Sequence, residues 1–365
     1  MNPGALLGAC LCSVLQCALL AVAVAAILRA VRRLDAASRY RTWSLVLLAA
    51  VALPAIDLAV RTSRPLDPAS PQRAFAAFVV AAPLAKALVV AWAAASSALL
   101  IRLAFSFARL RILCRRSGPV SAALEARAAL HAGTLGLSSA VTIRSSRDIA
   151  SPVAVELSRR VILVPERLLE MLSADELDYI LVHELTHLRR SDGIGNLLVK
   201  LARALLVWNP VLIFVERRIA FERELACDDA VVARFGNAGR YARCLATVML
   251  SAPMPAAVPF ARSARHTLRR IEHLATGVRR TAAPPRMALL GIAATIALAL
   301  CAEVSAPQFV ALDVPLEQTV TAPIFDADFG LPRGAVVPAA LELTPGVEPS
   351  FSPFIARGRR FVPKT

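Results

Sequence analysis

The amino-acid sequence predicts a polytopic α-helical membrane protein with four spans and a cytosolic α+β domain that is mostly helical. The first observation is composition. The 365 residues are 57% hydrophobic with a mean hydropathy of +0.59, which is far more apolar than expected of a soluble chain with 19% charged residues. The second observation is that the apolar residues form separate long runs, with one long charged segment between the third run and the fourth.

Charge and cysteine content argue against two other classes of protein. The net charge is +16 and the pI is near 10.9. The excess is arginine scattered between apolar blocks with few aromatic residues, so direct binding of nucleic acid is not expected. Seven cysteines are an odd number, and four of them lie inside apolar runs: Cys10, Cys12, Cys17 and Cys301. This pattern is not that of a disulfide framework.

The first predicted span covers residues 5–28, which contain no charged side chain and are followed by Arg29. A helix of this length crosses about 30 Å of hydrocarbon. A cleaved signal peptide is the alternative, but no basic residue precedes the run and it is longer than a typical signal-peptide core. Three further runs predict the second span at 43–60, the third at 79–105 and the fourth at 287–305.

Basic residues predict the orientation of these spans. Arginines crowd the loop after the first span and follow the third span directly: Arg29, Arg32, Arg33, Arg39, Arg41, Arg109, Arg111, Arg115 and Arg116. Since basic loops stay on the cytoplasmic side, we expect a protein of the cytoplasmic membrane with extracytoplasmic termini. The expected organisation is three spans in residues 1–106, a cytosolic domain in 107–286, the fourth span in 287–305 and an extracytoplasmic tail rich in Pro, Ala and Val in 306–365.

The segment after Ser173 carries the strongest chemical signal in the charged domain. Ser173 and Glu176 have the spacing of a capping box, which predicts a helix beginning here. That helix contains His183-Glu184-Leu-Thr-His187, and histidines four residues apart lie on one face, where both imidazoles can bind one zinc ion. Glu184 lies beside them and can take a proton from a metal-bound water, so the pattern indicates hydrolysis of peptide bonds.

A catalytic zinc ion needs a third protein ligand, and the acidic segment 222–229 offers candidates. Glu224 and Asp228 lie one helical turn apart, so Glu224 is predicted to bind the metal and Asp228 to orient a histidine. Glu222 would point elsewhere, and we expect it on a solvated face with ion pairs to its own helix. Cys227 is expected to be a small buried side chain with no ligand role.

The apolar segment 196–215 resembles another span, but Lys200 and Arg203 lie in its middle. Each would cost about 2.5–3.5 kcal/mol in the bilayer. A crossing here would also put His183 and Glu224 on opposite sides of the membrane. We therefore predict an amphipathic helix that ends at Trp208-Asn209-Pro210, followed by a new helix, with its apolar face against the membrane or the spans.

The remaining histidines have weaker signals. His131 lies in an Ala-rich helix and is expected at the surface, whereas His266 and His273 lie in a basic helix and are expected to have structural roles. Tyr241 and His266 are weak candidates for stabilising an oxyanion. No residue stands out for substrate binding.

Several linked motifs resemble the family of membrane metallopeptidases typified by the BlaR/MecR-type beta-lactam sensors. The resemblance covers roughly residues 151–274 and the arrangement of spans. In chain order the motifs are Ser151-Pro152, Val161-Ile-Leu-Val-Pro165, His183-Glu184-Leu-Thr-His187-Leu-Arg-Arg190-Ser-Asp192, Trp208-Asn209-Pro210, Glu224-Leu-Ala-Cys227-Asp228, Tyr241-Ala242 and Arg270-Ile271.

The resemblance implies a gluzincin-like site with His183, His187 and Glu224 on zinc, Glu184 as general base and Asp228 behind the ligands. Family members receive a signal outside the cell and cleave themselves or a transcriptional repressor in the cytosol. A protein substrate and the lipid bilayer are therefore the expected partners. This chain has Glu156 and Arg160 where the family usually has Gly and Pro, and its tail lacks a Ser-x-x-Lys motif, so covalent sensing of beta-lactams is not expected.

Two other functions stay open. A non-catalytic membrane transducer would keep zinc for structure alone. An intramembrane protease of the site-2 class would hold the same motif within the bilayer, but the charged residues that flank it argue against that depth: Asp175, Glu176, Asp178, Arg189, Arg190 and Asp192.

Overall fold

The computed structural model describes residues 3–31, 34–63, 77–137, 139–156, 159–251, 257–276 and 308–312. The chain separates into two units, Met1–Val314 and Pro315–Thr365, and the described residues all belong to the first. The predicted fourth span and all of the predicted tail except 308–312 lie outside the described residues.

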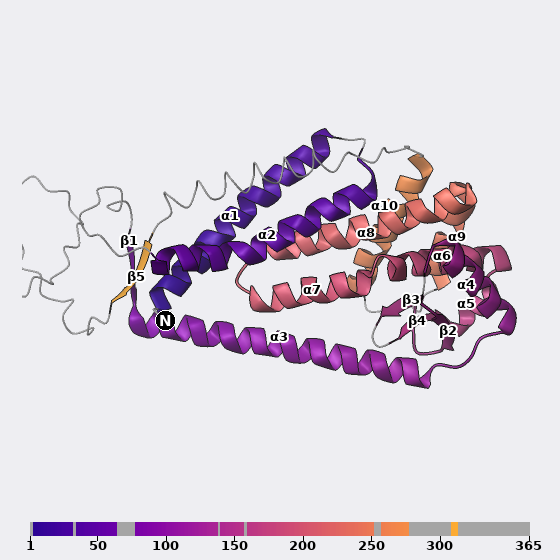
Figure 1. The fold of residues 1–365 in the computed structure, drawn as a ribbon, viewed down its shortest axis with the longest axis horizontal. Helices are drawn as coiled ribbons and strands as arrows, with labels where there is room; N and C mark the ends of the chain where they lie inside the picture. Colours follow the sequence, from indigo (N-terminus) through magenta and orange to yellow (C-terminus); the bar gives the residue numbers. More distant parts are fainter. Residues whose placement is uncertain are drawn as a thin grey trace, which may run out of the picture. The chain divides into compact units, whose positions relative to one another are not determined.

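Three long helices cover the first two predicted spans and most of the third (Figure 1). They are α1 (Pro3–Ala30), α2 (Ala36–Ser63) and α3 (Ala82–Arg116). Among the described residues, two segments are long and apolar enough to cross a membrane, Cys10–Ala30 in α1 and Pro83–Arg116 in α3. The 35 residues of α3 correspond to about 50 Å, which is longer than the hydrocarbon layer requires. This helix continues without a break through the predicted boundary at residue 106.

The start of the predicted third span differs from expectation. Residues 79–81 belong to strand β1 (Ala77–Ala81), which pairs in parallel with β5 (Gln308–Leu312), so the helix begins only at Ala82. β-branched and aromatic residues occupy the middle of β1, and they favour an extended backbone when another strand is available to pair with.

The segment expected to be amphipathic forms two helices, as predicted. Helix α7 (Asp192–Leu205) ends before Pro210, and α8 (Val211–Phe235) begins after it. The buried Asn209 side chain accepts a hydrogen bond from the backbone N–H of Val211, the first residue of α8, at 3.1 Å. The apolar faces of both helices pack against α1 and α2 in one cluster, including Val199, Leu206, Leu212, Leu20 and Val46.

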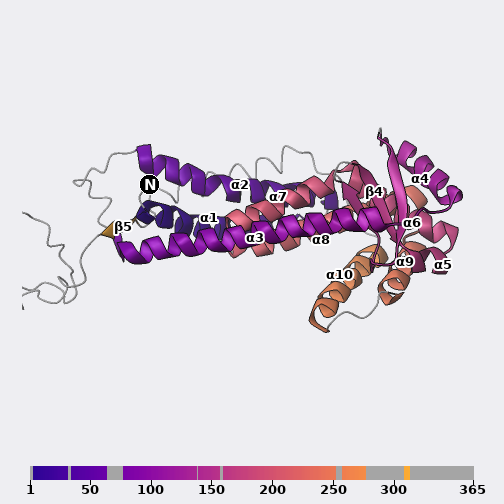
Figure 2. The same cartoon turned by 90° about the horizontal axis from the view of Figure 1, so that it is seen from below.

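Helix α7 also lies along α3, as Figure 2 shows. The Trp92 indole N–H donates to the Leu205 carbonyl at 2.9 Å, and the Trp92 and Trp208 rings meet edge to face at 5.4 Å. The hairpin of α7 and α8 therefore contacts all three long helices. With 14 residues, α7 extends only about 21 Å, too short to cross a bilayer.

The part that carries the histidine motif is a small sheet with helices packed on it, which confirms the prediction of short strands at 141–165 followed by helices. Strands β2 (Val141–Ser146), β4 (Arg160–Pro165) and β3 (Val153–Glu156) lie in the order β2-β4-β3, with β2 parallel and β3 antiparallel to β4. The helices are α4 (Ala122–Thr134), α5 (Glu166–Met171), α6 (Ala174–Arg189), α9 (Ala238–Ser251) and α10 (Ala257–Thr276).

Helix α6 is the centre of this core. Leu181, Leu185 and Leu188 recur at helical spacing and are each at most 1% exposed, packed with residues of β4, α4 and α9. The predicted capping box is present. The Ser173 hydroxyl accepts from the Glu176 backbone N–H, and Glu176 accepts from the Ser173 backbone N–H at 2.9 Å. A well-fixed first turn and a buried body hold the two histidines in a defined orientation.

We expect Ser173→Ala to lower the free energy of unfolding by about 1 kcal/mol, because the first turn of α6 loses its side-chain acceptor. The hydrogen bond from the Ser173 backbone lowers the pKa of Glu176. The contribution of the ionised Glu176 side chain to the free energy of unfolding is therefore present at neutral pH and is lost as the pH falls through that lowered pKa. Denaturant unfolding of the full chain in micelles tests both statements. Thr247→Ala, at a hydroxyl in the middle of a helix, is the control, and an equal effect in both variants would contradict the prediction.

Candidate metal centre

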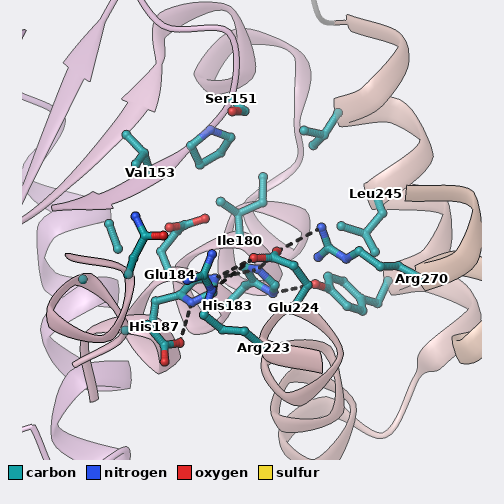
Figure 3. Close-up of a pocket in the computed structure, with 17 residues that line it drawn as sticks. Ser151, Val153, Ile180, His183, Glu184, His187, Arg223, Glu224, Leu245 and Arg270 are labelled. Atoms are coloured by element: carbon teal, nitrogen blue, oxygen red, sulfur yellow. Dashed lines mark hydrogen bonds and ion pairs between the residues drawn. The ribbon is translucent and has the colours of Figure 1, made fainter. Parts of the chain in front are cut away.

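His183 and His187 lie one turn apart on α6 and point in the same direction (Figure 3). Their Nε2 atoms are 3.3 Å apart, and their rings meet edge to face with centroids 4.9 Å apart. This is the placement that the spacing of four residues predicts, because side chains at i and i+4 share a helix face.

Glu224 reaches the same point from α8, which packs against α6. Its Oε2 lies 3.5 Å from His183 Nε2, and its Oε1 lies 3.8 Å from His187 Nε2. A tetrahedral zinc ion with bonds of about 2.0–2.1 Å places its ligand atoms about 3.3 Å apart. Two imidazole nitrogens and one carboxylate therefore fit zinc by both chemistry and spacing.

Asp228 and Tyr241 lie behind His183. Asp228 is fully buried, and its Oδ1 is 3.3 Å from His183 Nδ1. The Tyr241 hydroxyl donates to Asp228 Oδ1 at 2.7 Å and lies 3.0 Å from His183 Nδ1. These contacts favour the tautomer with hydrogen on Nδ1, which leaves Nε2 free to bind a metal. They also occupy the Tyr241 hydroxyl, so the structure does not favour the oxyanion role considered for it.

His187 has a corresponding partner that the sequence reasoning missed. Its Nδ1 lies 2.8 Å from Asp192 Oδ2, and Asp192 is only 4% exposed. Asp192 ends the motif that begins at His183, but it follows helix α6 and the αL residue Ser191, so helical spacing does not identify it. Each histidine thus has a buried carboxylate next to the nitrogen that faces away from the proposed metal position.

Cys227 lies close to the same histidine. Its Sγ is 3.4 Å from His187 Nδ1, and together with Asp192 these groups form a second cluster of possible metal ligands. Burial raises the pKa of the Cys227 thiol well above its ordinary value. A protonated thiol is a poor ligand, and His187 uses its other nitrogen toward Glu224. These observations favour the expectation that Cys227 fills space behind the site.

Arg270 is the main site residue that sequence reasoning did not single out. It comes from α10 and donates to both oxygens of Asp228, at 2.8 and 2.6 Å, and its Nη1 lies 3.4 Å from Glu224 Oε2. In Figure 3 its side chain points at Glu224. Its position within a basic helix gave no reason to distinguish it from Arg269. The only signal was its place in the ordered set of motifs.

The charges around the imidazoles favour a cation between them. Burial by itself lowers the pKa of His183, but hydrogen bonding with Asp228 and Glu224 outweighs burial and raises this pKa to about 9. Burial by itself raises the pKa of Glu224, but the two histidines and Arg270 hold it well below its ordinary value. The carboxylate is therefore ionised at neutral pH and attracts a positive charge, whether a proton or a metal ion.

Glu184 and the free edge of the sheet line the same cavity, which has a volume of about 410 Å³. Among the described residues β3 pairs with β4 alone, which leaves its other edge open, and Val153 and Ala154 of β3 line the cavity. Figure 3 shows Val153 opposite the imidazoles. Ile180, Leu245 and Val248 give the cavity an apolar wall. Glu156 and Arg160, where the chain departs from the family pattern, are partners across the β3–β4 pair and lie 3.3 Å apart.

Two expectations about charged residues are wrong. Glu222 is not solvated but 0% exposed, and Arg39 of α2 holds its carboxylate at 2.8 Å. His131 is not at the surface but 6% exposed, and its Nε2 lies 3.1 Å from Asp178. In both cases a distant element covers the helix face. The structural roles expected for His266 and His273 agree with their contacts, a ring contact with Phe221 and a 2.8 Å contact with Asp229.

Comparison with known proteins finds one family model and several curated relatives. A family model described as BlaR1 peptidase M56 matches residues 9–274. The Regulatory protein BlaR1 of Bacillus licheniformis is 33% identical over 92 residues, which are 25% of this chain and 15% of that protein. The Methicillin resistance mecR1 protein of Staphylococcus aureus strain Mu50 is 29% identical over 92 residues, 25% of this chain and 16% of that protein. The matched segment thus spans less than a fifth of these relatives.

Proposed function

Because this chain belongs to the BlaR1 peptidase M56 family, we propose that it is a membrane-embedded zinc endopeptidase that cleaves a cytosolic regulator in response to a signal. The observation that carries the proposal is the meeting of His183, His187 and Glu224 beside Glu184 in a cavity bounded by a free strand edge. The apolar helices α1 and α3 support a location in the membrane.

His183, His187 and Glu224 would hold the zinc ion, which when bound polarises a peptide carbonyl and makes water a stronger nucleophile. The chain's own groups do the rest. Asp192, Asp228 and Tyr241 keep both imidazoles in the orientation that frees Nε2. Glu184 takes the proton of the attacking water and delivers it to the leaving amine nitrogen.

The open edge of β3 supports an extended peptide as substrate. A strand with one unpaired edge can hydrogen bond to a peptide segment along its backbone, and the cavity between β3 and α6 has room for such a segment. The apolar side chains Ile180, Leu245 and Val248 would contact its side chains.

The regulatory role rests on the relatives' names, one a regulatory protein and one a resistance protein. We propose that the substrate is a repressor-like cytosolic protein, with cleavage of the chain itself as a second possibility, and that residues 107–286 lie in the cytosol. A structural zinc site is usually closed by four protein ligands. Among the described residues the donor group has three members and adjoins a cavity, which favours catalysis over a purely structural metal.

We expect the purified full chain to hold one zinc ion and to hydrolyse unfolded protein substrates, and Glu224→Ala to lose both properties. The variant leaves the zinc ion two protein ligands in place of the three that a catalytic site uses. Zinc content by elemental analysis and release of peptides from casein measure the two effects. Glu216→Gln on the same helix, whose carboxylate binds Lys200 and Arg203, is the control.

Zinc retained in the Glu224→Ala chain would contradict the proposed ligand set. Hydrolysis unaffected by Glu224→Ala would contradict the proposed reaction. For the site-2 alternative, we expect a cysteine introduced at Ser191 to react with a water-soluble thiol reagent added to inside-out vesicles, because the end of α6 lies outside the bilayer in our proposal.

A further inference from the structure

Two adjacent residues at the beginning of α2 contact the two halves of the proposed metal site. Arg39 binds Glu222, which is two residues before Glu224 on α8. The Tyr40 ring lies 4.6 Å from the Arg190 guanidinium, which lies 3.5 Å from Asp192, the partner of His187. We propose that Arg39 and Tyr40 are positioning residues, which couple the position of the second predicted span to the geometry of the metal site. The inference rests on the proposed function.

The contact with α8 is a buried charge pair. Arg39 Nε donates to Glu222 Oε1 at 2.9 Å, and its Nη2 lies 2.8 Å from the same oxygen. Glu222 is 0% exposed, and its Oε2 has no hydrogen-bond partner among the described residues. Arg39 is therefore the main group that compensates a buried carboxylate. The Arg218 guanidinium is also half-buried nearby, but it forms no described hydrogen bond with Glu222.

This pair controls the rotation of α8. Residues two positions apart are separated by a rotation of about 200° around the helix axis and so point to nearly opposite sides. Glu222 therefore faces α2 while Glu224 faces the imidazoles. If Glu222 lost Arg39, α8 would turn to hydrate the unpaired carboxylate, and that rotation would carry Glu224 away from His183 and His187. Ala36 is fully buried against Leu225 and Ala226, so the first turn of α2 packs directly beside this part of α8.

The contact through Tyr40 reaches the other half of the site. The Tyr40 ring orients Arg190 by a cation–π contact, and Arg190 in turn lies beside the Asp192 carboxylate that orients His187. Space for Tyr40 depends on Gly195, since a Cβ atom there would lie only 3.1 Å from the Tyr40 hydroxyl. A displacement of α2 would therefore change the surroundings of His187 as well as those of Glu224.

The test compares zinc release from the native full chain in lipid nanodiscs with release from Arg39→Met and Tyr40→Leu, using a chromogenic chelator. Loss of groups that orient metal ligands typically weakens binding about 10- to 100-fold, and we expect at least about tenfold faster release in both variants. Tyr40→Phe retains the ring and should release zinc within about twofold of the native rate. Arg41→Ala should do the same, because the hydrogen bonds of Arg41 to described residues stay within its own helix, at Ala37 and Ser38.

A second measurement detects coupling rather than structural damage. Linkage requires that zinc affect α2 if α2 affects zinc, so removal of zinc from the native chain should increase hydrogen exchange of the backbone at 36–42 at least about twofold. The double variant Arg39→Met with Glu222→Gln removes both charges and leaves no unpaired carboxylate. It should regain zinc retention, and its exchange at 36–42 should respond less to zinc than that of the native chain, because only the contact through Tyr40 remains.

The inference would be overturned if both Arg39→Met and Tyr40→Leu released zinc at the rate of the native chain. It would also be overturned if hydrogen exchange at 36–42 in the native chain did not change on removal of zinc. Failure of the double variant to regain zinc would show that Arg39 acts by some route other than its pair with Glu222, which also contradicts the proposal. Absence of zinc from the native chain would instead contradict the proposed function itself. The two failures are thus distinguishable without measuring peptide hydrolysis.

Discussion

Replacement of Glu184 by glutamine is expected to lower the turnover number for peptide hydrolysis by about 100- to 10,000-fold while zinc stays bound. An amide has nearly the shape of the carboxylate but cannot accept the proton of the attacking water. Glu184 lines the cavity on the same helix as the two histidines and makes no described contact with the carboxylates behind them. The substitution should therefore leave the metal ligands and their orientation unchanged.

The measurement pairs zinc content with single-turnover hydrolysis by the purified full chain. Asp175→Asn is the matched control, because it removes a carboxylate from the same helix at a side chain that is 72% exposed. Loss of activity together with loss of zinc would show that Glu184 has a structural role. Full activity would contradict the assignment as general base. Comparative proteomics of cells with the native and Glu184→Gln chains should reveal the substrate as a cytosolic protein that accumulates with the variant.

Arg270→Leu should lower the free energy of unfolding by about 3–5 kcal/mol, since it leaves the fully buried Asp228 carboxylate without its cation. It should also weaken zinc binding about 10- to 100-fold, because Asp228 orients His183 and Arg270 also contacts Glu224. Arg269→Leu is the control, one residue earlier on the exposed face of α10. Denaturant unfolding and chelator competition measure the two effects.

The pH dependence of the same variant provides a further check. Burial raises the pKa of Asp228, but Arg270 outweighs burial and lowers this pKa below its ordinary value. The pair therefore stabilises the fold above a pH of about 4, and that stability is lost as the pH falls through the lowered pKa. The free energy of unfolding of Arg270→Leu is expected to be lower than that of the native chain, and this difference should become smaller on acidification toward pH 3. A difference in the free energy of unfolding that stays constant with pH would contradict this account. So would a loss of stability no greater than that of Arg269→Leu.

Much of the metal-site helix was predictable because its signals are local. The capping box at Ser173 and Glu176 and the spacing of His183 and His187 act within one or two turns, and a helix converts such spacing directly into proximity. The break at Trp208-Asn209-Pro210 was predictable for the same reason, since proline excludes a continued helix. The prediction of Glu224 as a ligand required one more step. It assumed that the helix that carries this carboxylate, at a suitable distance along the chain, packs against α6.

Contacts between distant elements were not predictable from local patterns. Arg270 and Asp228 are 42 positions apart and Arg39 and Glu222 are 183 positions apart. A periodic pattern states which side chains share a face, but not which element covers that face. For this reason Glu222 was expected in solvent and is buried, and Arg270 was not distinguished from the arginines around it.

The sequence by itself determined the apolar helices, the break between α7 and α8, the two histidines on one face of α6 and the glutamate between them, because each follows from backbone preferences and hydrophobic burial over a few turns. Only the tertiary structure decided that α2 meets α8 at Glu222, that Asp192 lies behind His187 and that Arg270 closes over Asp228. The physical reason is that a buried charge is stable only with a partner, and packing, not local sequence, determines which partner reaches it.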